Sequence, residues 1–112
     1  MKPTLRDKKR YLLYNIDSST DIDLQKAISE LILKYFGVLG ISQTSLKVLY
    51  ILDEQKKMLL RCKPEHVQTV CFVFSLINHY YGKPIRFELI AISGTIASLK
   101  RKKGLKLPQK NF

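Results

Sequence analysis

Residues 85–104, IRFELIAISGTIASLKRKKG, place a strand, a turn and a basic helix next to one another in the chain. The first eight residues alternate with the period of two that a β-strand produces, and their apolarity predicts a central or well-covered strand. Ser93 or Thr95 can accept a hydrogen bond from the first amides of a helix, and Gly94 tolerates the turn between them. A helix is therefore expected to begin here. Its outward side would carry four basic residues, Lys100, Arg101, Lys102 and Lys103.

The N-terminal third of the chain predicts a strand followed by an amphipathic helix. Residues 11–16, YLLYNI, alternate so that the even positions suit one face of a strand. Thr20 is a good helix N-cap, and apolar residues then recur at spacings of three and four as far as Phe36. Gly37 would provide a left-handed stop, so residues 38–44 are expected to be a connector.

The middle of the chain predicts a hairpin and a second helix. Residues 45–52 and 57–63 alternate well on either side of a polar turn, with Leu46, Val48 and Tyr50 assigned to one face of the first strand. Pro64 suits the first turn of a helix, and an apolar stripe follows it. This second helix is expected to end near Gly82.

The order of these elements predicts the fold class. It is β-α-β-β-α-β plus a terminal helix, which indicates an α+β split-βαβ sandwich of the ferredoxin-like or RRM-like kind. Such a fold has an antiparallel four-stranded sheet with two helices on one face, here joined by a C-terminal basic helix. A chain of 112 residues has the length of a single domain with one hydrophobic core. We expect a basic N-terminal arm over residues 1–9, a single domain over 10–103 and a flexible basic tail over 104–112.

Two predicted surfaces carry more apolar residues than water contact favours. The face of the sheet opposite the two helices would show residues such as Leu13, Leu59 and Ile51, so either the terminal helix or a second protein chain is expected to cover it. The second helix is apolar beyond its core stripe, which indicates a protein interface or, alternatively, a deeply buried helix. The residues assigned to this protein interface are Phe72, Val73, Leu76 and Tyr80.

Positive charge is concentrated at the two ends of the chain. There are 20 basic and 9 acidic residues, a formal net charge of +11. Residues 1–10 hold five bases and one acid, residues 100–112 hold six bases and no acid, and the part between is nearly neutral. Cationic ends favour binding to a nucleic acid, because each neutralised phosphate releases condensed counterions. Tails that only confer solubility are the alternative. The bases of the N-terminal arm are Lys2, Arg6, Lys8, Lys9 and Arg10.

The predicted sheet offers little for reading bases. RRM-like domains stack bases on aromatic residues of their central strands. Only Tyr11 could serve in this way, since the third strand shows Lys57, Leu59 and Arg61 on the corresponding face. Phosphate and shape contacts are therefore expected instead.

Catalytic and metal-binding patterns are weak, and no metal site is expected. Cys62, His66, Cys71 and His79 lack the paired spacing of metal fingers. Residues 93–95 do not form a nucleophile elbow, because no pair of a His and an acidic residue is placed to activate a serine there. The backbone amides of this segment could hold a phosphate at the helix N-terminus, although plain helix capping is the simpler interpretation. A soluble cytoplasmic protein is expected, because no stretch approaches the roughly 18 apolar residues of a membrane helix and the N-terminus lacks a signal-peptide core.

Three segments are distinctive when taken together: KPTLRDKKRY at residues 2–11, Leu60-Arg61-Cys62, and Gly82-Lys83-Pro84 with Ile92-Ser93-Gly94-Thr95-Ile96. They resemble the family of archaeal ribonuclease P protein component 2, whose eukaryotic counterparts serve both ribonuclease P and ribonuclease MRP. The similarity spans nearly the whole chain. It implies the sandwich fold and an accessory role in the ribonucleoprotein that removes the 5′ leader from precursor tRNA. In that particle the RNA and its magnesium ions carry out the cleavage.

The resemblance also implies partners. They are ribonuclease P RNA, precursor tRNA, ribonuclease P protein component 3 and other ribonuclease P proteins, with two pairs of components 2 and 3 joined in a heterotetramer. No catalytic residue and no cofactor is expected on this chain. RNA binding is expected at the arm, at Ser93 and Thr95, and at residues 100–103. The alternatives are a ribosome-associated or other structured-RNA-binding protein, and a small-ligand regulatory domain of ferredoxin-like fold, which would need a polar pocket.

Overall fold

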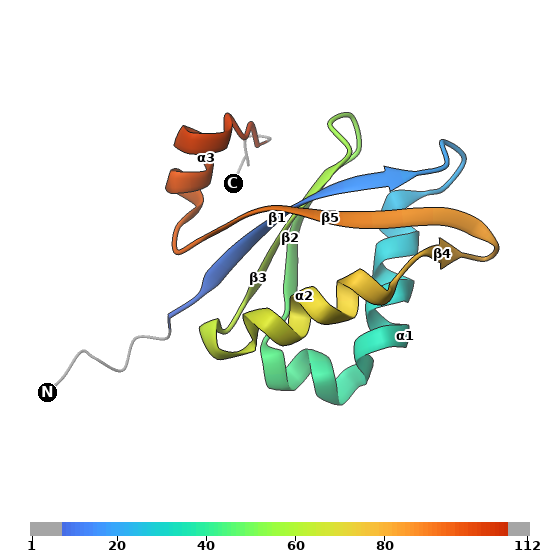
Figure 1. Cartoon of the computed structure of the whole chain (residues 1–112), viewed down its shortest axis with the longest axis horizontal. Coiled ribbons are helices and arrows are strands. Elements are labelled where there is room, and N and C mark those ends of the chain that lie inside the picture. The colour runs from blue at the N-terminus through green and yellow to red at the C-terminus, as the bar shows by residue number, and fades with distance from the viewer. Residues whose placement is uncertain (1–7, 108–112) are drawn as a thin grey trace, which may run out of the picture.

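The computed structural model describes residues 8–107 of the chain. Its antiparallel sheet has the strand order β2-β3-β1-β5-β4, with α1 and α2 on one face and α3 on the other (Figure 1). The strands are β1 Arg10–Ser18, β2 Lys47–Leu52, β3 Lys57–Cys62, β4 His79–Tyr80 and β5 Lys83–Ser93. The helices are α1 Leu24–Thr44, α2 Val67–Leu76 and α3 Ile96–Lys103, with a 3-10 turn, η2, at Pro64–His66. The predicted α+β sandwich with a terminal helix is confirmed, and a short fifth strand extends the sheet.

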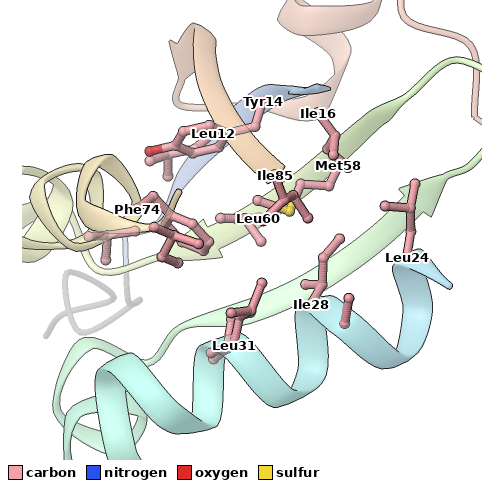
Figure 2. Packing of buried hydrophobic residues seen from close by; sticks show 14 of the residues in the cluster. Leu12, Tyr14, Ile16, Leu24, Ile28, Leu31, Met58, Leu60, Phe74 and Ile85 are labelled. Atoms are coloured by element: carbon pink, nitrogen blue, oxygen red, sulfur yellow. The ribbon is translucent and has the colours of Figure 1, made fainter. Parts of the chain in front are cut away.

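The main core lies between the sheet and helices α1 and α2 (Figure 2). Leu12, Tyr14 and Ile16 point into it from β1, which confirms the alternation predicted for the first strand. Ile28 of α1 and Phe74 of α2 meet them, and the rings of Tyr14 and Phe74 are 5.2 Å apart between centroids. Each fully buried side chain of this size stabilises the fold by about 1.5–3 kcal/mol.

The opposite face of the sheet is covered by α3 and the residues that follow it. Leu99 of α3 is 2% exposed, and Leu105 is 6% exposed. They pack on Leu13, Leu52 and Leu59 in a second apolar cluster. Of the two covers predicted for this face, the structure shows the terminal helix. The start of the segment expected to be a tail, residues 104–107, therefore packs on the sheet, and residues 108–112 lie outside the described part.

Helix α1 differs from the prediction at both ends. Its N-cap is Asp23 and not Thr20. Gly37, with φ 73° and ψ 170°, breaks the helical conformation at the predicted position. The chain then resumes the helix, so the prediction of a connector over residues 38–44 was wrong. The physical reason is that Ile41, in this segment, packs against the main core and extends the helical layer.

Helix α2 is shorter than predicted. It ends at Leu76, and His79 and Tyr80 form β4, which pairs with the start of β5. Tyr81 and Gly82 form the two-residue turn with φ of 49° and 80°, the positive values that tight hairpins require. The prediction of a helix running to Gly82 was wrong, because apolar spacing alone does not separate the end of a helix from a short strand.

A β-bulge shifts the facing of residues in β2. The register with β3 moves between Val48 and Tyr50. Val48 packs on the main core, whereas Tyr50 packs in the second cluster with Leu13 and Leu59. The assignment of Tyr50 to the same face as Val48 was therefore wrong, and Ile51 lies against the main core rather than on the opposite face. One extra residue in a strand is enough to exchange the two faces beyond it.

Candidate nucleic-acid interface

The end of the N-terminal arm lies beside the turn that leads into α3. Arg10 begins β1, and its guanidinium donates a 3.2 Å hydrogen bond to the carbonyl oxygen of Lys9. A Cβ atom on Gly94 would stand 3.7 Å from Nη1 of Arg10. The base of the arm therefore lies next to the turn from which α3 begins. Lys8 is exposed there and Lys9 is half-buried. Lys2 and Arg6 lie outside the described residues.

Helix α3 adds a dense group of positive charges. It carries Lys100, Arg101, Lys102 and Lys103, and all four are exposed. Among residues 8–107 none of them forms an ion pair. Cations in the last turn of a helix are favoured by the helix dipole, so their position also has a structural benefit. Their free charges remain available to phosphates.

Ser93 and Thr95 serve as helix caps. The Thr95 hydroxyl accepts a 3.1 Å hydrogen bond from the amide of Ser98, and the Ser93 hydroxyl accepts one of 3.2 Å from the amide of Thr95. The simpler interpretation, plain capping, is confirmed. Each hydroxyl also has a proton of its own that it can donate to an acceptor such as a phosphate oxygen. Their predicted role in RNA binding stays a prediction.

A row of residues continues this cationic region across the sheet. Strand pairing places Lys47 opposite Arg61, Arg61 opposite Tyr11, and Tyr11 opposite Ser93. Directly opposed residues of antiparallel strands project from the same face. Tyr11 packs in the second cluster, so this is the face that carries α3. The sequence placed Arg61 on this face, but nothing in it showed that this residue aligns with Lys47, Tyr11 and Ser93. Only the strand register does so.

The acidic residues of the sheet gather toward one end of the strands, where bases such as Lys57 and Arg86 accompany them, whereas the strands carry only bases at the other end. Arg10 and Arg61 lie at the end where β1 begins and β3 ends, next to the arm. The acidic residues of the strands and their turns lie toward the other end; they are Asp17, Asp53, Glu54 and Glu88. The domain between the two basic ends is nearly neutral in sum, yet its cationic end is continuous with the arm and with α3.

The residues predicted to form a protein interface fall on two elements. Phe72 and Leu76 are one turn apart on α2 and are 64% and 52% exposed, whereas Val73 is half-buried. Tyr80 belongs to β4, and its hydroxyl donates a 2.6 Å hydrogen bond to the carboxylate of Glu30 in α1. Helix α2 is therefore not deeply buried, and it leaves an apolar pair open to a partner.

The described residues hold no group of side chains arranged to bind a metal ion, and their buried cysteine is poorly reactive. Between residues 8 and 107, no three His, Cys, Asp or Glu side chains are arranged to hold a metal ion. Over the same range no helix is long and apolar enough to cross a membrane. Cys62 is buried, and this burial raises the pKa of its thiol to about 11. A thiol with such a pKa is protonated at neutral pH and is a poor nucleophile.

Comparison with known proteins gives a consistent set of relatives. The Rpp14/Pop5 family matches residues 10–103. Ribonuclease P protein component 2 of Pyrococcus horikoshii is 34% identical, over 91% of this chain and 88% of that protein. The same component of Methanocaldococcus jannaschii is 30% identical, over 100% of this chain and 85% of that protein. A chain in the cryo-EM structure of yeast ribonuclease MRP matches with a TM-score of 0.60 at 16% identity, covering 80% of this chain and 76% of that one. At that identity the match supports the fold alone.

Proposed function

This chain belongs to the Rpp14/Pop5 family, and from that membership we propose that it is a non-catalytic protein subunit of ribonuclease P. The relatives just described are ribonuclease P protein components and span nearly the whole chain. In this proposal the complex removes the 5′ leader of precursor tRNA, and the RNA subunit with its magnesium ions carries out the cleavage. The chain contributes binding and stabilisation of that RNA.

The observation that carries the RNA-binding part is the cationic end of the domain. The base of the arm, the row that contains Arg61 and the turn that leads into the exposed bases of α3 all lie at this end. A folded RNA brings its phosphates close together, and fixed cations reduce their mutual repulsion. The subunit would therefore let the active RNA fold form at a lower magnesium concentration.

Reconstituted cleavage at a series of magnesium concentrations tests this function. The variant replaces both clusters, residues Lys8, Lys9 and Arg10 together with residues 100–103, by glutamine. We expect a loss of precursor cleavage at low magnesium that added magnesium restores. A second variant replaces only residues 100–103 and so removes four charges. Its matched control also removes four charges, by glutamine at Lys26, Lys34, Lys56 and Lys57, which lie elsewhere on the protein. Unchanged cleavage after replacement of both clusters would refute the proposal.

The second part of the proposal concerns protein partners. Ribonuclease P protein component 3 would bind the apolar pair Phe72 and Leu76 of α2, and two such complexes would join in a heterotetramer. Support comes from the exposure of both side chains on one side of a helix whose other side is buried in the core. Tyr80 was predicted from the sequence to belong to the same interface. Its hydroxyl donates a hydrogen bond to Glu30 of α1, and we leave it out of this interface.

A further inference from the structure

The cross-strand row Lys47, Arg61, Tyr11 and Ser93 has properties that the exposed bases of α3 lack. It runs across β2, β3, β1 and β5, and at about 4.8 Å between strands it spans roughly 14 Å. Lys47 is exposed, whereas the other three residues are half-buried. The row lies at the end of the sheet where β1 begins and β5 ends.

We propose that this row binds an unpaired segment of RNA, with phosphates held by Arg61 and Lys47 and one base stacked on Tyr11. The proposal rests on the RNA-binding function above and adds the site and the kind of RNA. It commits to single-stranded RNA because the row holds an aromatic ring, Tyr11, between two groups that can bind phosphates. An aromatic ring binds unpaired bases, whose faces are accessible, better than the stacked bases of a duplex.

Arg61 has an unused donor. Its Nε atom is buried and has no hydrogen-bond partner among residues 8–107. A buried donor without an acceptor costs free energy, so the side chain is not held in place by a partner at this atom. The guanidinium also offers a planar fork of donors that matches a phosphate. No acidic residue of the sheet is paired with it, since its cross-strand neighbours are Lys47 and Tyr11.

Tyr11 can provide one stacking position and no more. The next residues on the same face of β1 and β3 are Leu13 and Leu59, and both are buried beneath α3. The positions that form the two-base platform of RRM-like sheets are therefore covered here. Beyond these leucines, at the start of β1, a single half-buried ring lies opposite a guanidinium, next to the basic arm.

Fluorescence anisotropy of the full chain tests the site with two RNA probes, a short unstructured strand and a hairpin of equal nucleotide count. The variants are Arg61→Gln, Tyr11→Leu and Tyr11→Phe. Lys57→Gln is the matched control, because Lys57 is on the same strand as Arg61 but at the opposite end. Binding is measured over a range of salt concentrations, and thermal unfolding verifies that each variant is folded.

The expected results differ for the two side chains. Arg61→Gln lowers the slope of log K against log salt on the unstructured strand by about 0.7, the value for one phosphate contact on single strands, and Lys57→Gln does not. Tyr11→Leu weakens binding of the strand about fivefold or more without changing the slope, and Tyr11→Phe retains the affinity. The hairpin is affected much less by Tyr11→Leu.

Three results would overturn the proposal. If Arg61→Gln and Tyr11→Leu behave like Lys57→Gln while glutamines at residues 100–103 still weaken binding, the row is not a site and the proposed function stands. If Tyr11→Leu weakens strand and hairpin equally, the row is a general phosphate surface without stacking. If the unaltered chain binds neither probe, both this proposal and the RNA-binding function fail. Arg61→Gln removes no core side chain, so it still tests the phosphate contact if Tyr11→Leu unfolds the protein, and an unchanged salt slope for Arg61→Gln is then enough to reject the row.

Discussion

The guanidinium of Arg10 lies beside Gly94, 3.7 Å from the position that a Cβ atom would take. This neighbourhood joins the first residue of β1 to the turn before α3. In the proposed RNA interface, a phosphate bound at this turn would also be close to Arg10. The charge at this point is predicted to matter more than the shape of the turn, because a contact of 3.7 Å is ordinary and leaves room for a methyl group.

Substitutions at Gly94 separate these two effects. Gly94→Asp places a carboxylate next to the Arg10 guanidinium and should weaken RNA binding about two- to fivefold, comparable to an exposed ion pair of up to ~1 kcal/mol. Gly94→Ala should bind RNA as the unaltered chain does. Titration of the ribonuclease P RNA with each variant measures the difference. Equal affinities for the two variants would show that the Arg10 charge does not contact the RNA.

Aspartate at Phe72 or Leu76 should disrupt binding of protein component 3. Both side chains are mostly exposed, so the free energy of unfolding should change by no more than about 0.5 kcal/mol. If they are central to an interface, the complex should weaken at least about tenfold. Isothermal titration with component 3 gives the affinity. Leu39→Asp is the control, because Leu39 is 69% exposed on a different helix, α1. An intact complex in both α2 variants would place the partner elsewhere.

The hydrogen bond from Tyr80 to Glu30 should make stability depend on pH in the alkaline range. The bond, together with partial desolvation and the Glu30 charge, raises the pKa of Tyr80 from 10.0 to about 12. A raised pKa means that folding favours the protonated phenol, so its contribution is complete below about pH 10 and is lost as the pH rises through 12. Denaturant unfolding of the unaltered chain and of Tyr80→Phe should therefore differ more at pH 8 than at pH 11.5. A difference that does not change with pH would contradict the assignment.

The sequence predicted those features whose signal is local. The alternation of Leu12, Tyr14 and Ile16 reports directly on one face of a strand, and the composition of the chain ends reports on charge. The row containing Arg61 and Tyr11 was not predictable, because it depends on pairing between strands far apart in the sequence. The β-bulge in β2 and the end of α2 were missed for a related reason. The bulge depends on the pairing of β2 with β3, and the end of α2 depends on the pairing of β4 with β5. The local spacing of apolar residues carries no information about either pairing.

Gly37 provides a test of the break within α1. Its φ of 73° and ψ of 170° lie in a region that is populated almost only by glycine. A Cβ at this position would meet no atom within 4 Å, so Gly37→Ala introduces backbone strain without a steric clash. We expect a loss of about 1–3 kcal/mol in the free energy of unfolding. Denaturant unfolding measures it.

Gly40→Ala is the matched control in the same helix. Gly40 has no positive φ, and its added Cβ would stand 3.5 Å from the Cβ of Phe36, an ordinary contact. Alanine there should stabilise the protein by about 0.5–1 kcal/mol, because glycine loses more conformational freedom in a helix. Opposite signs at the two positions would establish that Gly37 is required for its conformation and not for space. If both alanines stabilise the protein, α1 runs without a break and the segment from Val38 to Thr44 takes a different direction from the one described.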